Sequence, residues 1–186
     1  MTLRTTVFIA TSLDGYIARP DGAIDWLEQA NQHVPAGEDC GYAAYMATVD
    51  LLVMGRGTFE KVLSFPEWPF PDKPVWVVSR TGRGLPDDLP PQVRITGESP
   101  DQIVRTAGEQ GFQHLYVDGG MLIQSFLREG LIDDLTITTI PILLGAGRPL
   151  FGTLPADVPL RLVASRAYPF GFVQSSYVVQ KGFESG

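Results

Sequence analysis

Four short segments, apolar over almost all of their length, limit most strongly the folds that this 186-residue chain can adopt. They span residues 7–10, 51–54, 75–78 and 114–117, and stretches with a helical pattern lie between them. A strand that is apolar on both faces must be covered on both faces, which is typical of a parallel sheet between helical layers. The pattern therefore predicts an α/β fold with a mostly parallel central sheet flanked by helices.

The remaining pattern completes one domain, with a core over about residues 4–180. Further strands are expected over 135–140 and in the C-terminal stretches 161–163 and 173–179, which alternate around a turn at 168–171. This alternation predicts an antiparallel hairpin with one buried face. Helices are expected after Asp39, behind Gly55, from Ser99 to about Gly111, and from Gly119-Gly120 to Gly130, and Pro-rich surface loops are expected over 66–74 and 82–91.

Charge and cysteine content exclude several classes of protein. Fourteen Lys and Arg against 21 Asp and Glu give a formal net charge of −7, so no broad basic face is expected for nucleic acid or an anionic membrane. No apolar run approaches the length of a membrane span. Cys40 is the single cysteine, and no Cys/His spacing indicates zinc. We expect a cytoplasmic protein without a disulfide or a metal.

Residues suited to phosphate follow three of the predicted strands. They lie at 55–58 (Gly-Arg-Gly-Thr), at 79–81 (Ser-Arg-Thr) and at 118–120 (Asp-Gly-Gly). In such sheets ligands bind beyond the carboxyl ends of the strands, where helix starts offer unpaired N–H groups. Each motif alone is also explained by turn geometry or by a solvated surface arginine. Together they indicate a ligand with several phosphates, such as a dinucleotide.

These motifs, with others in the same order, carry a family resemblance. Residues 11–18, 25–26 and 53–60 resemble the dihydrofolate reductase superfamily. The match extends through 77–80, 117–120 and 140–147, and it is closest to the C-terminal reductase domain of the bifunctional riboflavin-biosynthesis deaminase-reductase. No deaminase domain accompanies it, so a stand-alone reductase with a dihydrofolate-reductase-like fold is expected.

The resemblance implies NADPH as the cofactor. By motif, the pyrophosphate and the adenosine-side phosphate would be held by Gly55, Arg56, Gly57 and Thr58. The 2′-phosphate would be bound by Ser79, Arg80 and Thr81. The pyrophosphate and the nicotinamide-side ribose would be covered by Gly119, Gly120, Met121 and Leu122, and the nicotinamide ring would lie against Ala10 and Ile17.

The substrate side leaves alternatives open. Asp39 matches the position of the pterin-binding carboxylate of the folate enzymes, which would make it catalytic and substrate-binding; it is equally explained as the cap of the following helix. Asp14 would contact a substrate sugar by resemblance, or simply form an Asp-Gly turn. Trp26 would line the pocket of a planar substrate, or pack in the core. For Arg148, contact with a ligand and contact with another subunit both stay open.

Two departures bear on the substrate. Tyr16 stands where riboflavin reductases usually carry Lys or Arg, and residues 28–40 are acidic and polar where those enzymes recognise a phosphorylated sugar. We expect an NADPH-dependent reductase of a small heterocyclic or sugar-derived substrate, similar to 5-amino-6-(5-phosphoribosylamino)uracil reductase and dihydrofolate reductase, and acting as a homodimer. The alternatives are a non-catalytic NADPH-, nucleotide- or drug-binding module of the same fold and, last, a purely structural interaction domain.

Overall fold

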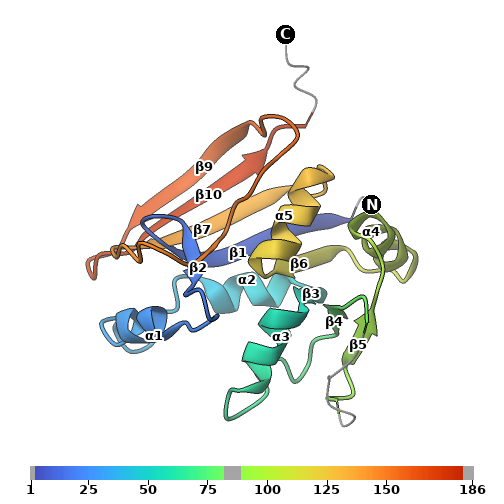
Figure 1. Ribbon diagram of the computed structural model, residues 1–186, viewed down its shortest axis with the longest axis horizontal. Helices are drawn as coiled ribbons and strands as arrows, with labels where there is room; N and C mark the ends of the chain where they lie inside the picture. Colours follow the sequence, from blue (N-terminus) through green and yellow to red (C-terminus); the bar gives the residue numbers. More distant parts are fainter. Residues whose placement is uncertain (1–2, 82–88, 182–186) are drawn as a thin grey trace.

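The fold is taken from a computed structural model, which describes residues 3–81 and 89–181. Eight strands form one sheet in the order β5-β4-β3-β6-β1-β7-β10-β9 (Figure 1). The six strands from β5 to β7 are parallel, and β10 runs antiparallel to both β7 and β9. The strands are β1 (Arg4–Ser12), β3 (Leu51–Gly55), β4 (Val75–Val78), β5 (Val93–Thr96), β6 (His114–Asp118), β7 (Asp134–Ile140), β9 (Leu160–Ala167) and β10 (Val173–Val179). The predicted parallel sheet with a C-terminal hairpin is confirmed.

Helices cover both faces of the parallel part because its strands are apolar on both faces. On one face, α4 (Pro100–Glu109) and α5 (Gly120–Arg128) pack Ile103, Ile123 and Phe126 onto the sheet. On the other face, α2 (Tyr42–Thr48) and α3 (Arg56–Leu63) lie over alternate residues of β3 and β4. On that second face, α1 (Asp25–Asn31) buries Trp26 against Ile140 of β7.

Four elements were not expected from the sequence. They are α1, β5 and the two strands of a small separate ribbon, β2 (Tyr16–Ala18) and β8 (Arg148–Pro149). The strands β2 and β8, of three and two residues, are too short for an alternating pattern. The strand β5 carries an exposed arginine between apolar residues, and Trp26 is the single buried residue of α1. Of the surface loop expected over 82–91, residues 82–88 lie outside the described part of the chain.

The C-terminal hairpin differs from the expectation in its burial. All eight residues of β9 are exposed, so the prediction of a hairpin with one buried face is wrong for this strand. The reason is its place in the sheet: β9 is the edge strand, beside β10, and stands apart from α2, α3 and α4 (Figure 1). Its alternating pattern forms a strand, but among the described residues no second layer covers it.

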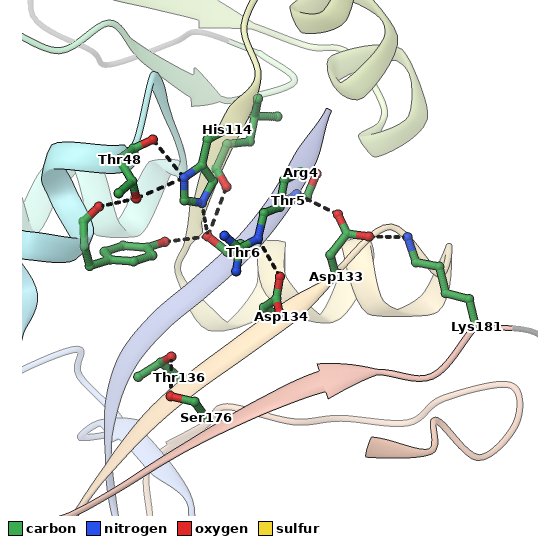
Figure 2. Close-up of polar contacts among 12 residues, drawn as sticks. Arg4, Thr5, Thr6, Thr48, His114, Asp133, Asp134, Thr136, Ser176 and Lys181 are labelled. Atoms are coloured by element: carbon green, nitrogen blue, oxygen red, sulfur yellow. Dashed lines mark hydrogen bonds and ion pairs between the residues drawn. The ribbon is translucent and has the colours of Figure 1, made fainter. Parts of the chain in front are cut away.

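Hydrogen bonds and ion pairs connect side chains at the edge of the sheet where β1 and β6 begin (Figure 2). The Thr6 hydroxyl lies 2.7 Å from the Tyr45 hydroxyl and 2.8 Å from His114 Nε2, and His114 Nδ1 lies 2.9 Å from the carbonyl oxygen of Thr48. Burial lowers the pKa of His114, so the imidazole is held neutral. Beside this cluster, Arg4 Nε donates to Asp134 at 2.7 Å. The polar groups of Thr6, Tyr45, His114, Arg4 and Asp134 at this edge are thus paired with one another.

Candidate active site

The three predicted phosphate-binding motifs meet at one edge of the sheet. They follow β4, β3 and β6, which are neighbouring parallel strands with Gly55 opposite Val78 and Met54 opposite Asp118. The motifs after β3 and β6 also touch, because a Cβ added at Gly119 would collide with the Thr58 hydroxyl and one at Gly55 would lie 3.9 Å from Leu122 Cβ. The structure therefore brings 55–58 and 119–122 together, with 79–81 on the next strand.

Two helix starts at this edge have no side-chain cap. The N-cap residues of α3 and α5 are Gly55 and Gly119, which have no side chain to cap the first turn, and at α5 the Asp118 carboxylate accepts the N–H of Gly119 itself at 2.8 Å. By contrast, α4 is closed by a capping box between Ser99 and Gln102. The first N–H groups of an uncapped helix need an external partner, and the positive end of the helix dipole favours an anion. The starts of α3 and α5 thus suit the phosphates of one dinucleotide.

Arg56 and Arg148 supply positive charge at the start of α3. Arg56 Nε donates to Glu60 on the same helix at 2.6 Å. Arg148 comes from β8, and its guanidinium covers Gly22 with its Nη1 atom 3.7 Å from the Cβ position of Gly57. Within residues 3–81 and 89–181, no carboxylate lies within ion-pair distance of Arg148. The structure therefore places Arg148 against a motif predicted to bind phosphate.

The β2–β8 ribbon packs on the start of α5. A Cβ added at Gly120 would lie 2.9 Å from both Ile17 Cδ1 and the carbonyl oxygen of Pro149. Only glycine fits beneath the ribbon at this point, which explains why residue 120 carries no side chain. Ile17 is thereby brought beside the predicted pyrophosphate turn.

The other predicted cofactor residues differ in exposure. Ser79 is buried, and its N–H donates to the Thr96 carbonyl at 2.9 Å, whereas Arg80 and Thr81 are exposed at the surface. Met121 and Leu122 both belong to α5, but Met121 is 84% exposed whereas Leu122 is buried in the core. Leu122 can therefore offer a ligand little more than its main chain.

A cavity of about 550 Å³ opens on the α1–α2 face of the sheet, next to this edge. Its floor is formed by β1 and β7 and its walls by α1, the segment 34–40, Tyr42 and Phe172. Ala10, the predicted nicotinamide contact, belongs to the floor, whereas no residue of 55–58, 79–81 or 118–122 lines the cavity. The cavity approaches the edge through Tyr42, on which the charge of Asp118 acts. Its volume is typical of a small-molecule site. The lining residues are Phe8, Ile9, Ala10, Leu27, Asn31, Val34, Pro35, Ala36, Gly37, Glu38, Asp39, Cys40, Tyr42, Thr138, Ile140 and Phe172.

Asp39 lines this cavity and also caps α2. Its Oδ1 accepts the N–H of Gly41 at 2.8 Å and its Oδ2 accepts the N–H of Ala43 at 2.7 Å. These main-chain hydrogen bonds lower the pKa of Asp39, because they stabilise the carboxylate. The expected helix begins after Asp39 and Cys40 rather than at them, with Cys40 at a φ of +54°. Asp39 is thus a lasting anion in the wall and a weak proton donor; its contact with substrate stays a prediction.

The two other predicted substrate residues have structural roles. The Asp14 carboxylate accepts the Ser12 hydroxyl at 2.6 Å and the N–H groups of Leu144 and Gly145 at 3.1 and 2.7 Å, so it joins the β1–β2 turn to the loop before β8. The Ser12 hydrogen bond is the main cause of its lowered pKa. Trp26 is 1% exposed and packs with Ile140 and Phe172. It is absent from the cavity lining, so its position does not support the predicted substrate contact.

Asp118 is a candidate that the sequence reasoning passed over. It ends β6 on the sheet face that carries Tyr116 and Phe8, and its Oδ1 accepts the Gly119 N–H at 2.8 Å. Desolvation by the surrounding groups raises the pKa of Asp118 to about 6. The pKa of Tyr42, which lines the cavity, is raised mainly by burial and further by the charge of Asp118. In the sequence, the feature that could have identified it is a carboxylate at the end of a predicted strand, directly before the glycine pair. A carboxyl group with this pKa can donate a proton near neutral pH.

Two kinds of feature are missing from the described residues. None of the helices in these ranges is long and apolar enough to cross a membrane. In the same part of the chain, no three His, Cys, Asp or Glu side chains gather closely enough to hold a metal ion.

The parallel sheet, its antiparallel hairpin and the glycine-rich edge define an α/β protein with the dihydrofolate reductase fold. The chain belongs to the RibD C-terminal domain family, whose model matches residues 4–173.

Relatives of this chain cover nearly all of it. YwjB of Bacillus subtilis (strain 168), a protein without a characterised function, is 36% identical over 173 residues, which are 90% of this chain and 94% of YwjB. A crystal structure from Shewanella sp. PV-4, assigned provisionally to riboflavin biosynthesis, superimposes with a TM-score of 0.89 at 42% identity, over 96% of this chain and 100% of that one.

A more distant structure shares the fold alone. The Thermotoga maritima diaminohydroxyphosphoribosylaminopyrimidine deaminase/5-amino-6-(5-phosphoribosylamino)uracil reductase has a TM-score of 0.68 at 18% identity. The alignment covers 96% of this chain and 57% of the Thermotoga chain.

Proposed function

We propose that this protein is an NADPH-dependent reductase that transfers a hydride to a C=N or C=O bond of a small heterocyclic or sugar-derived substrate. The observation that carries the proposal is the single edge that gathers the helix starts at Gly55 and Gly119 with Arg56 and Arg148, together with a ligand-sized cavity over β1 and β7 of the same sheet. Membership of a family with reductase members supports the reaction class. The cavity beside the edge gives a second molecule a place next to the cofactor.

The residues at this edge fit NADPH. Pyrophosphate would be held by the first N–H groups of α3 and α5, with Arg56 and Arg148 as cations, and Arg80 would bind the 2′-phosphate. Ala10 and Ile17 would contact the nicotinamide. When bound, the cofactor supplies the hydride. The protein positions the two rings and excludes water from between them.

Reduction of C=N or C=O also consumes a proton, which must reach the nitrogen or oxygen. We propose Asp118 as its source, because its pKa of about 6 leaves a protonated fraction near neutral pH, whereas Asp39 has a lowered pKa. Asp118 lies outside the cavity lining and acts on Tyr42, which is part of it, so the proton passes from Asp118 through a bridging water and the carboxyl group is reprotonated from solvent.

Cofactor affinity tests the 2′-phosphate assignment. Arg80→Ala is expected to weaken NADPH binding by about tenfold or more and to leave NADH binding nearly unchanged, because only NADPH carries the group that Arg80 would pair with. Isothermal titration with each dinucleotide measures both constants. Arg128→Ala, in the last turn of α5 and away from this edge, is the matched control. An equal loss for both cofactors would contradict the role of Arg80, and no NADPH binding by the unmodified chain would refute the proposed function.

We further propose that two copies pair through the uncovered hairpin. The edge strand β9 exposes Leu160, Leu162 and Val163, and neighbouring Val173 of β10 is 42% exposed. A run of exposed apolar residues on an edge strand is a ready surface for association. Light scattering is expected to give twice the mass of one chain, and Leu162→Arg is expected to give the mass of a single chain without loss of secondary structure. A single-chain mass for the unmodified protein would contradict the dimer.

A further inference from the structure

We infer that the cavity beside the cofactor edge accepts a flat, uncharged or positively charged ring and rejects a phosphorylated substrate. The inference rests on the proposed function and narrows it. The inference implies that 5-amino-6-(5-phosphoribosylamino)uracil, the compound named for the Thermotoga protein, is not the substrate of this chain, because that compound carries a phosphate.

The cavity has an apolar, flat-sided interior. Phe8 and Ala10 of β1 and Ile140 of β7 form its floor, and Leu27 and Phe172 form parts of its wall. The Phe8 ring is fixed from behind by stacking on Tyr45, with ring centroids 4.8 Å apart. A flat ring can bury apolar surface on both of its faces against such walls, and this burial contributes most of the binding free energy.

The wall opposite this floor is acidic. Glu38 and Asp39 are the charged residues among those that line the cavity in the described part of the chain, and none of the lining residues there is Lys, Arg or His. Both carboxylates are fixed: Glu38 Oε1 accepts the Cys40 N–H at 2.7 Å, and the main chain holds Asp39. The wall is also tied to the sheet, since Gln174 Nε2 donates to the Cys40 carbonyl at 2.9 Å and to the Thr138 hydroxyl at 3.0 Å.

Arg166, Lys61 and Arg19 already have acidic or aromatic partners. Arg166 lies 3.6 Å from Glu38 and 4.3 Å above the Tyr168 ring. Lys61 lies 3.7 Å from Glu28, and Arg19 pairs with Asp25 at 2.6 Å. A phosphate on the substrate would therefore enter beside Asp39 and beside Glu38, which is paired with Arg166, with no guanidinium or ammonium in the lining itself, and this costs desolvation and like-charge repulsion. A neutral ring avoids both costs, and a cation is attracted.

Two fluorescent rings that differ in charge test the inference. The protein, saturated with NADP⁺ so that no reduction occurs, is titrated with 6-methylpterin, which is neutral at pH 7, and with 6-carboxypterin, which is anionic. Quenching of pterin fluorescence gives each Kd. We expect the neutral ring to bind at least about tenfold more tightly, the effect of one like-charge contact in a partly screened site. Equal or tighter binding of the anion, or no binding of either ring at millimolar concentration, would overturn the inference.

A second experiment adds a positive charge to the cavity wall. Asn31 is exposed at the end of α1 and lines the cavity, and Gln32 follows it outside the lining. Asn31→Arg is expected to remove the preference against 6-carboxypterin, whereas Gln32→Arg should keep it. An unchanged preference in Asn31→Arg would also overturn the inference.

The proposed function is tested separately by NADPH titration of the same samples. If NADPH does not bind, the reductase fails as a proposal. The pterin pair, titrated without cofactor, still decides the charge selectivity of the cavity.

Discussion

Asp118→Asn is expected to lower the rate of hydride transfer by about two to four orders of magnitude, the usual contribution of a positioned general acid. Asparagine keeps the oxygen that accepts the Gly119 N–H at 2.8 Å, so the turn before α5 should keep its geometry. NADPH affinity is therefore expected to stay within about twofold of the unmodified protein. Stopped-flow absorbance of NADPH measures the rate, and titration measures the affinity.

The pH dependence gives this prediction a second readout. The pKa of Asp118 is raised to about 6, so its acid form is complete well below pH 6 and is lost as the pH rises through this value. Because kcat/KM reports groups of the free enzyme, kcat/KM should be level at low pH and fall by about tenfold per pH unit above 6. In Asp118→Asn the slope should disappear. A substrate that does not titrate between pH 5 and 8 is required, and an unchanged slope in the variant would exclude Asp118 as the proton source.

The second large effect is expected from Gly119→Ala. Gly119 has a φ of +97° and a ψ of 128°, a conformation that side-chain-bearing residues avoid. Its new Cβ would in addition collide with the Thr58 hydroxyl on α3. We expect the free energy of unfolding to fall by about 2–4 kcal/mol and NADPH affinity to fall with it, because α3 and α5 must move apart. Denaturant titration measures the stability.

Gly111→Ala separates backbone strain from collision. Gly111 has a φ of +87°, and a Cβ added there would meet no atom within 4 Å. In this control the free energy of unfolding should fall only by the backbone strain, about 1–2 kcal/mol. Adding Thr58→Ala to Gly119→Ala should recover the part due to the hydroxyl. If Gly119→Ala lowers the free energy of unfolding no more than Gly111→Ala does, the close contact between Gly119 and Thr58 does not constrain residue 119.

Much of the sheet could be predicted from local pattern. Residues 51–54 and 75–78 are apolar throughout, and a strand of that kind has a stable place only between two layers. The helix start at Ser99-Pro100 is equally local, since it depends on the cap and on the first turn. The exposure of β9 was not predictable, because alternation shows which residues share a face and leaves open whether another layer covers that face.

Some features of the candidate site could likewise be predicted from the sequence, and others could not. That the turns at 55–58, 79–81 and 118–120 lie along one edge could be predicted from the sequence, because parallel strands bring their carboxyl ends to the same edge of the sheet. Arg148 reaches Gly57 from 91 positions further along the chain, which no spacing rule foresees. Trp26 and Leu27 are adjacent, yet one is in the core and the other lines the cavity.

By itself, the sequence determined that this chain forms a covered parallel sheet with glycine-bearing turns along one edge, because periodicity and turn chemistry act over a few neighbouring residues. Only the tertiary structure decided that Asp118 is desolvated, that Asp39 is held as an anion by main-chain N–H groups, and that the cavity wall is acidic. These properties depend on which distant groups surround a side chain, since solvation and electrostatic interactions act through space and not along the chain.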